Sequence, residues 1–258
     1  MEDSDRLFSL EGKVSLVTGG GRGLGLGMAR ALAGAGSDVV LVSRTEGELS
    51  EAARALSQET GRRALAIAAD LSRLEELDRV VGMTLDEFQK IHILVNNAGI
   101  NVRKPFFEVT PEEFERVVSV NLRAVYFLTQ KVAQHMVQRG EGGKIIHTAS
   151  LSAQMGIPNI SIYGTTKGGV YALTKQLAVE LAPYRILVNA IAPGYFRTSM
   201  TEAVFQDPQR SAWVASRTPL GRPGVPSDLG GVAVFLASAA SDYLTGSVLY
   251  VDGGWMSA

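Results

Sequence analysis

The stretch TGGGRGLG, residues 18–25, follows the apolar run VSLV at residues 14–17. It fails the common dinucleotide spacing G-x-G-x-x-G in every register, and no Gly-Lys-Ser/Thr follows that would make it a P-loop. A glycine-rich turn between a strand and a helix is nevertheless where parallel-sheet proteins bind phosphate. The register Gly19-x-x-x-Gly23-x-Gly25 therefore predicts a nucleotide loop with a different spacing. The alternative is a turn that only closes a strand against a helix.

Outward from this loop, short β-branched runs alternate with longer helical patterns. Most of the short runs are apolar on both alternations, as strands covered on both faces are. This alternation predicts an α/β, doubly wound Rossmann fold, mainly a seven-stranded parallel sheet with helices on both faces, in a single domain 1–258. The expected strands are 13–18, 38–43, 63–69, 92–96, 144–149, 185–191 and 247–251, and the expected helices are 23–35, 46–59, 73–89, 111–139, 161–181 and 227–238.

Two local signals refine this layout. Thr110, Pro111 and Glu113 have the order of a capping box with proline at the first helical position, so a helix should begin at residue 111. The segment 193–226 is rich in proline and glycine at its ends and carries short helical pieces. An insertion of this kind beside the carboxyl edge of a sheet is a candidate lid.

Composition excludes several classes of protein. The 258 residues are 46% hydrophobic and 20% charged, with a net charge of −1 and a pI of about 6.3, so no basic excess indicates a nucleic-acid partner or an anionic membrane. There is no cysteine, which fits a cytoplasmic protein and removes thiolate chemistry. No apolar run approaches the roughly 18 residues of a membrane span, and the acidic N-terminus does not have the order of a signal peptide. Three histidines without an H-E-x-x-H pair predict no metal site.

The end of the second expected strand bears on the choice of nucleotide. An acidic residue usually stands there in NAD-binding proteins and accepts from the ribose 2′-hydroxyl. Here the strand ends in Ser43, followed by Arg44, and Arg22 lies in the glycine loop. Two arginines without a carboxylate favour NADP over NAD, because a forked cation suits a 2′-phosphate. The alternative is that both arginines are solvated surface residues.

Tyr163 and Lys167 stand four residues apart at the start of an expected helix, so their side chains share one face. A lysine cation favours a nearby phenolate, which would lower the pKa of the tyrosine. The pair could then donate a proton to a carbonyl or accept one from an alcohol. Ser150, at the carboxyl end of the preceding strand, could bind the reacting oxygen.

In this order and spacing, the motifs resemble the short-chain dehydrogenase/reductase family over essentially the whole chain. The matching motifs are TGGGRGLG at 18–25, Asp70-Leu71, Asn96-Asn97-Ala98-Gly99, Val120-Asn121-Leu122, Ser150, Tyr163, Lys167, and Pro193-Gly194 with Thr198. The resemblance implies that the catalytic residues are Asn121, Ser150, Tyr163 and Lys167, with Tyr163 as the proton donor or acceptor. It implies hydride transfer by the cofactor without a metal, and a homotetramer built through 111–139, 161–181 and the C-terminal segment.

The same resemblance, with the arginines above, assigns residues to the cofactor. They are Gly19, Gly21, Arg22, Gly23, Leu24, Gly25, Ser43, Arg44, Asp70, Leu71, Asn97, Ala98, Gly99, Tyr163, Lys167, Pro193, Gly194, Phe196 and Thr198. Phe196 departs from the family pattern, which has a smaller aliphatic residue there. His147 and Thr148 replace the more usual Asn-Ile, and the alternation of the strand places His147 among packing residues without a function of its own.

Within the family, several stretches are most similar to the gluconate 5-dehydrogenase (5-keto-gluconate reductase) group and the related deoxygluconate dehydrogenases. They are 6–12, 97–103, 192–201, 217–222 and 251–255. The substrate residues would be Ser150, Tyr163 and Arg103, where Arg103 could pair with a carboxylate. The apolar side chains of 193–226 would equally suit an apolar ketone. A 3-oxoacyl-carrier-protein reductase, a broad-range ketone reductase and a non-catalytic dinucleotide sensor or scaffold remain as alternatives.

Overall fold

The computed structural model describes residues 6–257; the extreme N-terminal residues used in the signal-peptide argument lie outside that range. One parallel sheet of seven strands runs through these residues in the order β3-β2-β1-β4-β5-β6-β7. Its strands are β1 Val14–Thr18, β2 Asp38–Ser43, β3 Ala64–Ala68, β4 Ile93–Asn96, β5 Gly143–Thr148, β6 Ile186–Pro193 and β7 Val248–Val251. The predicted seven-stranded parallel sheet is confirmed.

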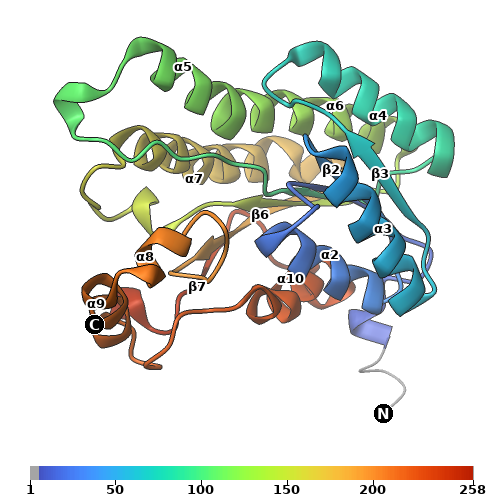
Figure 1. The fold of residues 1–258 in the computed structure, drawn as a ribbon. Helices are drawn as coiled ribbons and strands as arrows, with labels where there is room; N and C mark the ends of the chain where they lie inside the picture. The colour runs from blue at the N-terminus through green and yellow to red at the C-terminus, as the bar shows by residue number, and fades with distance from the viewer. Residues whose placement is uncertain (1–5, 258) are drawn as a thin grey trace.

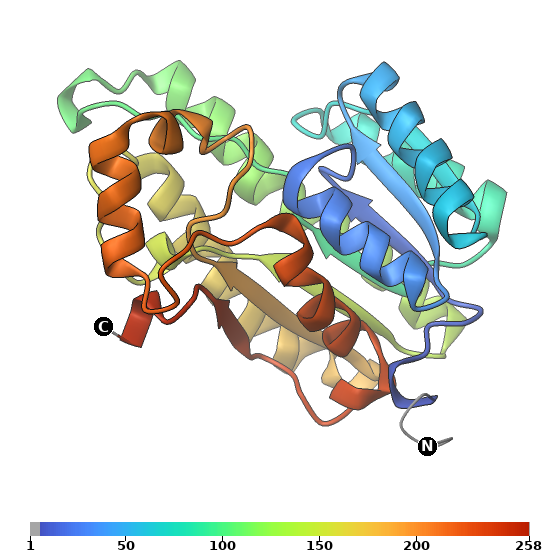
Figure 2. The ribbon, with the colours of Figure 1, turned by 60° about the horizontal axis from the view of Figure 1, so that its bottom comes forward.

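Helices cover both faces of the sheet (Figure 1). On one face lie α2 Gly23–Gly34, α3 Glu46–Thr60 and α10 Gly230–Ala237; on the other lie α4 Leu74–Phe88, α5 Pro111–Val118, α6 Ala124–Arg139 and α7 Ser161–Leu181. The shorter helices α8 Glu202–Gln206 and α9 Pro208–Arg217 lie beyond the carboxyl end of β6. Figure 2 shows α2 and α10 side by side on their face of the sheet.

Each face of the sheet has its own apolar core. Met28, Leu49 and Ala233 belong to the core beneath α2, α3 and α10. Leu77 and Leu128 belong to the core beneath α4, α6 and α7. Because both faces are covered, the strands needed apolar residues at successive positions, as the sequence pattern indicated.

The expected helix over 111–139 is interrupted in the structure. Its start is confirmed, since the Glu113 amide donates to Thr110 Oγ1 at 3.3 Å and the Glu113 carboxylate accepts from the Thr110 amide at 3.0 Å. A π-helical segment, Ser119–Arg123, then separates α5 from α6. Such segments are frequently found at functional sites, and this one carries Asn121. The helix expected at 227–238 likewise begins as a 3₁₀ turn, Pro226–Leu229, before α10.

The glycine loop uses backbone conformations that other residues adopt poorly. Gly19 has φ +65° and Gly23 has φ +56°, both in the left-handed region. Gly25 lies so close to the chain of Gly19 that a Cβ atom would overlap the Gly19 carbonyl oxygen. The loop therefore folds back on itself at the carboxyl edge of β1 and leads directly into α2.

The substitution Gly25→Ala should destabilise the protein, because the new methyl group meets backbone that cannot move without reshaping the loop. Overpacking of this kind costs about 2 kcal/mol or more. Urea unfolding followed by circular dichroism measures the loss. The control is Gly34→Ala in the same helix, where a Cβ atom meets nothing within 4 Å and should be neutral or stabilising. Equal stability of the Gly25 variant and the wild type would contradict the packing described here.

Candidate active site

Thr18 closes the junction between β1 and β4, where the strand order reverses. Its hydroxyl accepts hydrogen bonds from the amides of Asn97, at 2.9 Å, and Ala98, at 3.0 Å, and donates to Val95 O at 3.3 Å. The Asn97 side-chain amide donates to Thr18 O at 3.0 Å and to Gly19 O at 3.3 Å. The glycine loop and the segment after β4 are thus held against each other at the switch point of the sheet, where open α/β sheets bind ligands.

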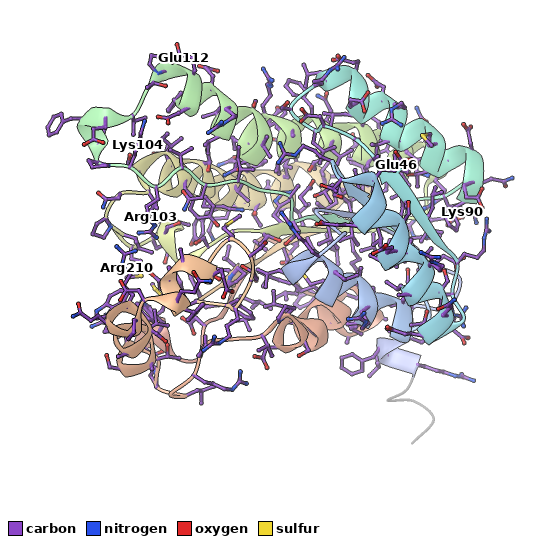
Figure 3. The ribbon with its side chains drawn as sticks, viewed as in Figure 1. Glu46, Lys90, Arg103, Lys104, Glu112 and Arg210 are labelled. Carbon is purple, nitrogen blue, oxygen red and sulfur yellow. The ribbon has the colours of Figure 1, made fainter. Side chains whose placement is uncertain are left out.

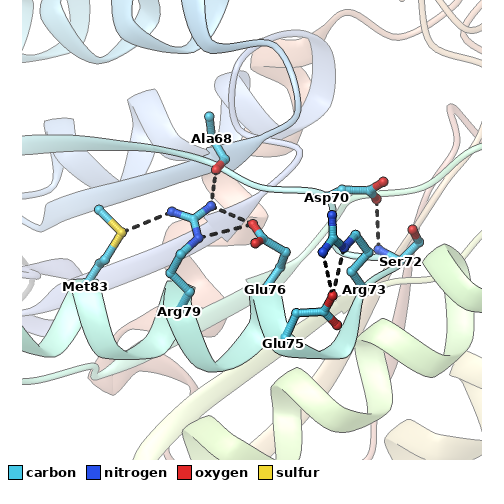
Figure 4. Close-up of polar contacts among 8 residues, drawn as sticks. All are labelled: Ala68, Asp70, Ser72, Arg73, Glu75, Glu76, Arg79 and Met83. Atoms are coloured by element: carbon cyan, nitrogen blue, oxygen red, sulfur yellow. Dashed lines mark hydrogen bonds and ion pairs between the residues drawn. The ribbon is translucent and has the colours of Figure 1, made fainter.

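Asp70 and the end of β2 form the outer part of this crevice. Asp70 Oδ1 accepts from the Ser72 amide at 3.0 Å, as Figure 4 shows. Burial alone would raise the pKa of Asp70, but hydrogen bonding from Ser72 and the charges of Arg44 and Arg73 lower that pKa below its ordinary value. Asp70 therefore remains an ionised acceptor. Arg73 itself pairs with Glu75 at 2.7 Å.

The two arginines expected to distinguish NADP from NAD both lie exposed near Ser43. Ser43 borders the glycine loop, because a Cβ atom on Gly21 would lie 3.2 Å from Ser43 Oγ. Arg22 is 67% exposed and is 3.5 Å from Glu48. The charge of Arg44 lowers the pKa of Asp70, so the two side chains lie near each other.

Asn121 links the π-helical segment to the loop after β4. It is fully buried, and its side chain accepts from the Ile100 amide at 2.9 Å and donates to the Ile100 carbonyl at 2.9 Å. It also donates to Thr166 Oγ1 at 3.2 Å. A Cβ atom on Gly99 would lie 3.4 Å from Asn121 Oδ1 and 3.8 Å from Lys167 Nζ. Asn121 and Lys167 are therefore brought together around the open space at Gly99.

Lys167 is a buried cation at the carboxyl end of β5. It is 4% exposed, and its Nζ donates to Thr148 O at 2.6 Å. Burial lowers the pKa of Lys167 from 10.5 to about 8. Nζ lies 5.6 Å from the centre of the Tyr163 ring, so the expected pair is formed on one face of α7.

The expected lowering of the Tyr163 pKa is not what the structure gives. Burial raises the pKa of Tyr163, and hydrogen bonding with Ser150 opposes the rise. Lys167 donates to the backbone of Thr148 rather than to the phenol. Tyr163 is therefore held as a neutral hydroxyl group, which is the form that can donate a proton.

Ser150 has a second serine beside it that the sequence analysis did not identify. Ser150 Oγ accepts from the Ser152 amide at 3.2 Å and from the Ser152 hydroxyl at 3.0 Å. A hydroxyl oxygen has two lone pairs and one proton. With both lone pairs engaged by Ser152, the proton of Ser150 is left to donate to another oxygen. No motif in the sequence pointed to Ser152, because the contact depends on the 3₁₀ turn Leu151–Ala153.

The segment after β6 folds back over the glycine loop. A Cβ atom on Gly23 would lie 3.7 Å from the Thr198 side chain. Thr201 holds this segment, because its hydroxyl accepts from the Thr198 amide at 3.1 Å and donates to Phe196 O. Pro193 ends β6, and Gly194 lies against Asp252, whose Cα would be 2.7 Å from a Cβ atom there. Thr201 is a further positioning residue that the sequence analysis missed.

Three side chains assigned to the cofactor instead pack into the cores. Phe196 is 4% exposed and lies in the core beneath α2 and α10, against Gly224. Leu24 packs against that core, and Leu71 lies in the core on the opposite face. Phe196 and Leu71 are therefore left with little exposed side chain for a cofactor, whereas Leu24 is only partly buried.

Arg103 lies at the same edge of the sheet as α8 and α9 (Figure 3). Its Nη1 is 3.5 Å from Pro158 O. Burial raises the pKa of Tyr195, and the charge of the nearby Arg103 opposes that rise. Tyr195 packs against Trp213 and Trp255 with ring centres 6.1 Å and 4.9 Å away.

Residues 6–257 show neither a membrane-spanning helix nor a cluster of metal ligands. None of the helices described there is both long and apolar enough to cross a membrane. Over the same residues, no three histidine, cysteine or acidic side chains gather as a metal site would require.

Comparisons with known proteins agree on the architecture. Residues 19–256 match the family model described as enoyl-(acyl carrier protein) reductase. The 2-dehydro-3-deoxy-D-gluconate 5-dehydrogenase of Escherichia coli K12 is 44% identical over 97% of this chain and 98% of its own. The 5-keto-D-gluconate 5-reductase of the same strain is 41% identical over 98% of each chain. The crystal structure of a Burkholderia cenocepacia gluconate 5-dehydrogenase with NADP and tartrate aligns with a TM-score of 0.94, at 40% identity over 99% of both chains.

Replacing the buried cation should stabilise the protein. The fall in the pKa of Lys167 from 10.5 to about 8 corresponds to about 3 kcal/mol at neutral pH, so Lys167→Met should unfold at higher denaturant concentration than the wild type. Below pH 8 the folded protein pays the full cost of holding the ammonium; the cost disappears as pH rises from about 8 to 10.5, because the lysine then loses its proton. Denaturant unfolding of the wild type and the variant at pH 7 and at pH 10 measures the stability difference at each pH. A less stable variant at pH 7, or a difference that grows with pH, would contradict this account.

Proposed function

Because the chain belongs to the short-chain dehydrogenase/reductase family, we propose that it is an NADP-dependent oxidoreductase that interconverts a ketone and a secondary alcohol in a sugar acid such as 5-keto-D-gluconate and gluconate. The proposal is supported above all by a connected set of contacts: Asn121 and Lys167 lie beside Gly99, Lys167 Nζ is 5.6 Å from the centre of the Tyr163 ring, and Tyr163 is hydrogen-bonded with Ser150. Residues 1–258 then form one nucleotide-binding catalytic domain. The substrate class is supported by two relatives, which are named for 2-dehydro-3-deoxy-D-gluconate and 5-keto-D-gluconate.

The residues at the carboxyl edge fit a dinucleotide. Gly19 and Gly23 turn the chain with positive φ, and the glycine loop leads into the N-terminus of α2, where backbone N–H groups favour a phosphate. The space at Gly99 would be filled by a side chain of any other residue. Asp70 is an ionised acceptor suited to an amino group such as that of adenine.

NADP rather than NAD follows from the charges around Ser43. The end of β2 carries no carboxylate, while Arg44 lies near Asp70 and Arg22 lies in the glycine loop. The pairing of Arg22 with Glu48 is between exposed side chains, and such pairs are worth little. Arg22 can therefore turn to a 2′-phosphate at small cost.

The cofactor, when bound, supplies the hydride. Tyr163 is neutral and donates its hydroxyl proton to the carbonyl oxygen during reduction. Ser150 donates a hydrogen bond to the same oxygen, since Ser152 occupies its lone pairs. Lys167 keeps a positive charge near the phenol and stabilises the phenolate that forms as the proton leaves.

A carboxylate on the substrate would find its partner in Arg103. Arg103 is exposed at the mouth of the site and lies near Tyr195, whereas the neighbouring Lys104 is held by Glu113 at 2.9 Å. Forked pairing of a guanidinium with a carboxylate is strong and directional. The aromatic group of Tyr195, Trp213 and Trp255 lies nearby, with Trp213 exposed and Trp255 buried, so an acyl thioester or an apolar ketone remains the rival substrate.

The proposal includes a homo-oligomer, a tetramer in the family pattern, in the cytoplasm. A groove of about 360 Å³ runs along α6 and α7, lined among others by Tyr126, Val137, Leu177 and Tyr184. Tyr126 and Tyr184 are 45% and 49% exposed, so the groove has apolar walls that a second copy could cover. The absence of cysteine accords with a reducing compartment.

A two-substrate comparison tests the function. With NADPH, the protein should reduce 5-keto-D-gluconate with a kcat/KM at least about tenfold above that for an acetoacetyl thioester. Tyr163→Phe should abolish both reactions, because it removes the proton donor. Turnover of the thioester alone would overturn the sugar-acid assignment, and activity unchanged in Tyr163→Phe would overturn the catalytic one.

Arg103→Met should raise KM for the sugar acid about tenfold or more, with Lys104→Met as the control that leaves this KM unchanged.

Arg44→Asp should reverse the cofactor preference. Removal of a guanidinium and introduction of a carboxylate beside a 2′-phosphate should weaken NADPH about tenfold to a hundredfold relative to NADH. Fluorescence titration with both nucleotides measures the ratio. Arg30→Asp is the control, because Arg30 is an exposed arginine in the second half of α2 that pairs with Glu59 at 2.7 Å. Equal losses for the two nucleotides in Arg44→Asp would contradict the NADP assignment.

A further inference from the structure

His147 lies at the centre of a buried polar chain that the mechanism does not use. It is fully buried on β5, with Nδ1 3.0 Å from Thr174 Oγ1 on α7 and Nε2 3.4 Å from Thr129 Oγ1 on α6. Thr129 in turn accepts from Asn96 Nδ2 on β4 at 2.9 Å. The chain thus joins two neighbouring strands to the two helices that cover them.

The direction of every bond in the chain can be assigned. Thr174 donates its only hydroxyl proton to Val170 O at 2.8 Å, so it can only accept from His147. His147 therefore carries its proton on Nδ1 and presents Nε2 as an acceptor. Thr129 supplies the proton for Nε2, since the structure of residues 6–257 gives its hydroxyl no bond to a carbonyl of its own helix. All four polar side chains are satisfied, as buried groups must be.

This arrangement accepts only neutral imidazole. Protonation of Nε2 would oppose the hydroxyl donor of Thr129 and add a second buried cation near Lys167. Burial and the charge of Lys167 lower the pKa of His147 from 6.5 to about 3. Among the titratable groups, Lys167 is the one whose charge acts on His147; Thr129, Thr174 and Asn96 are uncharged.

The polar chain through His147 contacts helix α7 two turns beyond Lys167. Thr174 is seven residues beyond Lys167, so both side chains lie on the buried face of α7. His147 and Thr148 are successive residues of β5, and they bind Thr174 and Lys167 respectively. Helix α7 is therefore fastened to β5 by these two polar contacts, two turns apart.

We propose that His147 is a positioning residue: through Thr174 it fixes helix α7 on β5, and so sets the burial of Lys167 and the placement of Tyr163. The proposal rests on the catalytic role proposed above for those two residues. Loss of the contact lets α7 separate from β5, which hydrates Lys167 and displaces the proton donor. A misplacement of about 1 Å can cost a hundredfold in rate.

Two threonine variants separate positioning from stability. Thr174 and Thr84 are both fully buried helical threonines that donate to the carbonyl four residues earlier, at 2.8 Å and 2.7 Å. Thr174→Val removes that bond and the histidine contact, whereas Thr84→Val removes only the bond. With the sugar acid or whichever ketone the wild type reduces, Thr174→Val should lower kcat about tenfold and move the alkaline limb of the pH profile upward by at least about 0.5. Thr84→Val should leave kcat within about twofold and the limb unmoved.

The histidine variants complete the test. His147→Leu should reproduce the kinetic changes of Thr174→Val, and the double variant should add little to either, because both remove one contact. His147→Asn, whose amide keeps one donor and one acceptor, should recover part of kcat. The proposal would be overturned if Thr174→Val and Thr84→Val, compared at equal stability, had the same kcat and the same alkaline limb. It would also be overturned if the losses in kcat of the two single variants added fully in the double variant.

A spectroscopic measurement keeps this inference separate from the proposed reaction. In protein labelled with ¹⁵N-histidine, the signal lost in His147→Asn identifies His147. It should show the neutral form with the proton on Nδ1 from pH 8 down to pH 5, with or without NADPH. A proton on Nε2, or titration above pH 5, would overturn the inference even if the reaction is correct. The expected tautomer together with no turnover of any ketone would overturn the proposed function alone.

Discussion

The hydroxyl group of Thr18 is the small contact on which the crevice depends. It joins β1 to the segment after β4 at the place where the strand order reverses, and it does so with one donated and two accepted hydrogen bonds. The Asn97 side chain completes the junction by binding the carbonyl groups of Thr18 and Gly19. Because these bonds leave little freedom, Gly19, Gly23 and Gly25 must adopt the turn that brings α2 to the edge of the sheet.

The second constraint is the burial of a positive charge. Lys167 is held by a single backbone carbonyl in an environment that favours its neutral form. Burial of a charge that lacks a charged partner costs free energy and lowers the stability of the fold. Stability is given up here for a cation beside Tyr163, a trade found at functional sites.

The π-helical segment that carries Asn121 could not be predicted from apolar periodicity. The apolar spacing over 111–139 is that of one helix, and the capping pattern at Thr110 correctly predicted where this helix begins. The extra residue that creates the π-helical segment leaves no mark in that spacing. It follows from the hydrogen bonds of Asn121 to Ile100 and Thr166, which lie on other parts of the chain. In the same way, no local pattern could show that Ser152 binds Ser150 or that Phe196 turns into the core.

The sequence by itself determined the seven strands and their order of alternation with helices, and it predicted the nucleotide loop and the four candidate catalytic residues. It could do so because apolar periodicity, glycine spacing and caps are local properties of the chain. Only the tertiary structure decided the protonation of Tyr163, the tautomer of His147 and the direction of the Ser150 proton. These depend on burial and on the count of donors and acceptors around each atom, and both are set by residues distant in sequence that meet when the sheet is assembled.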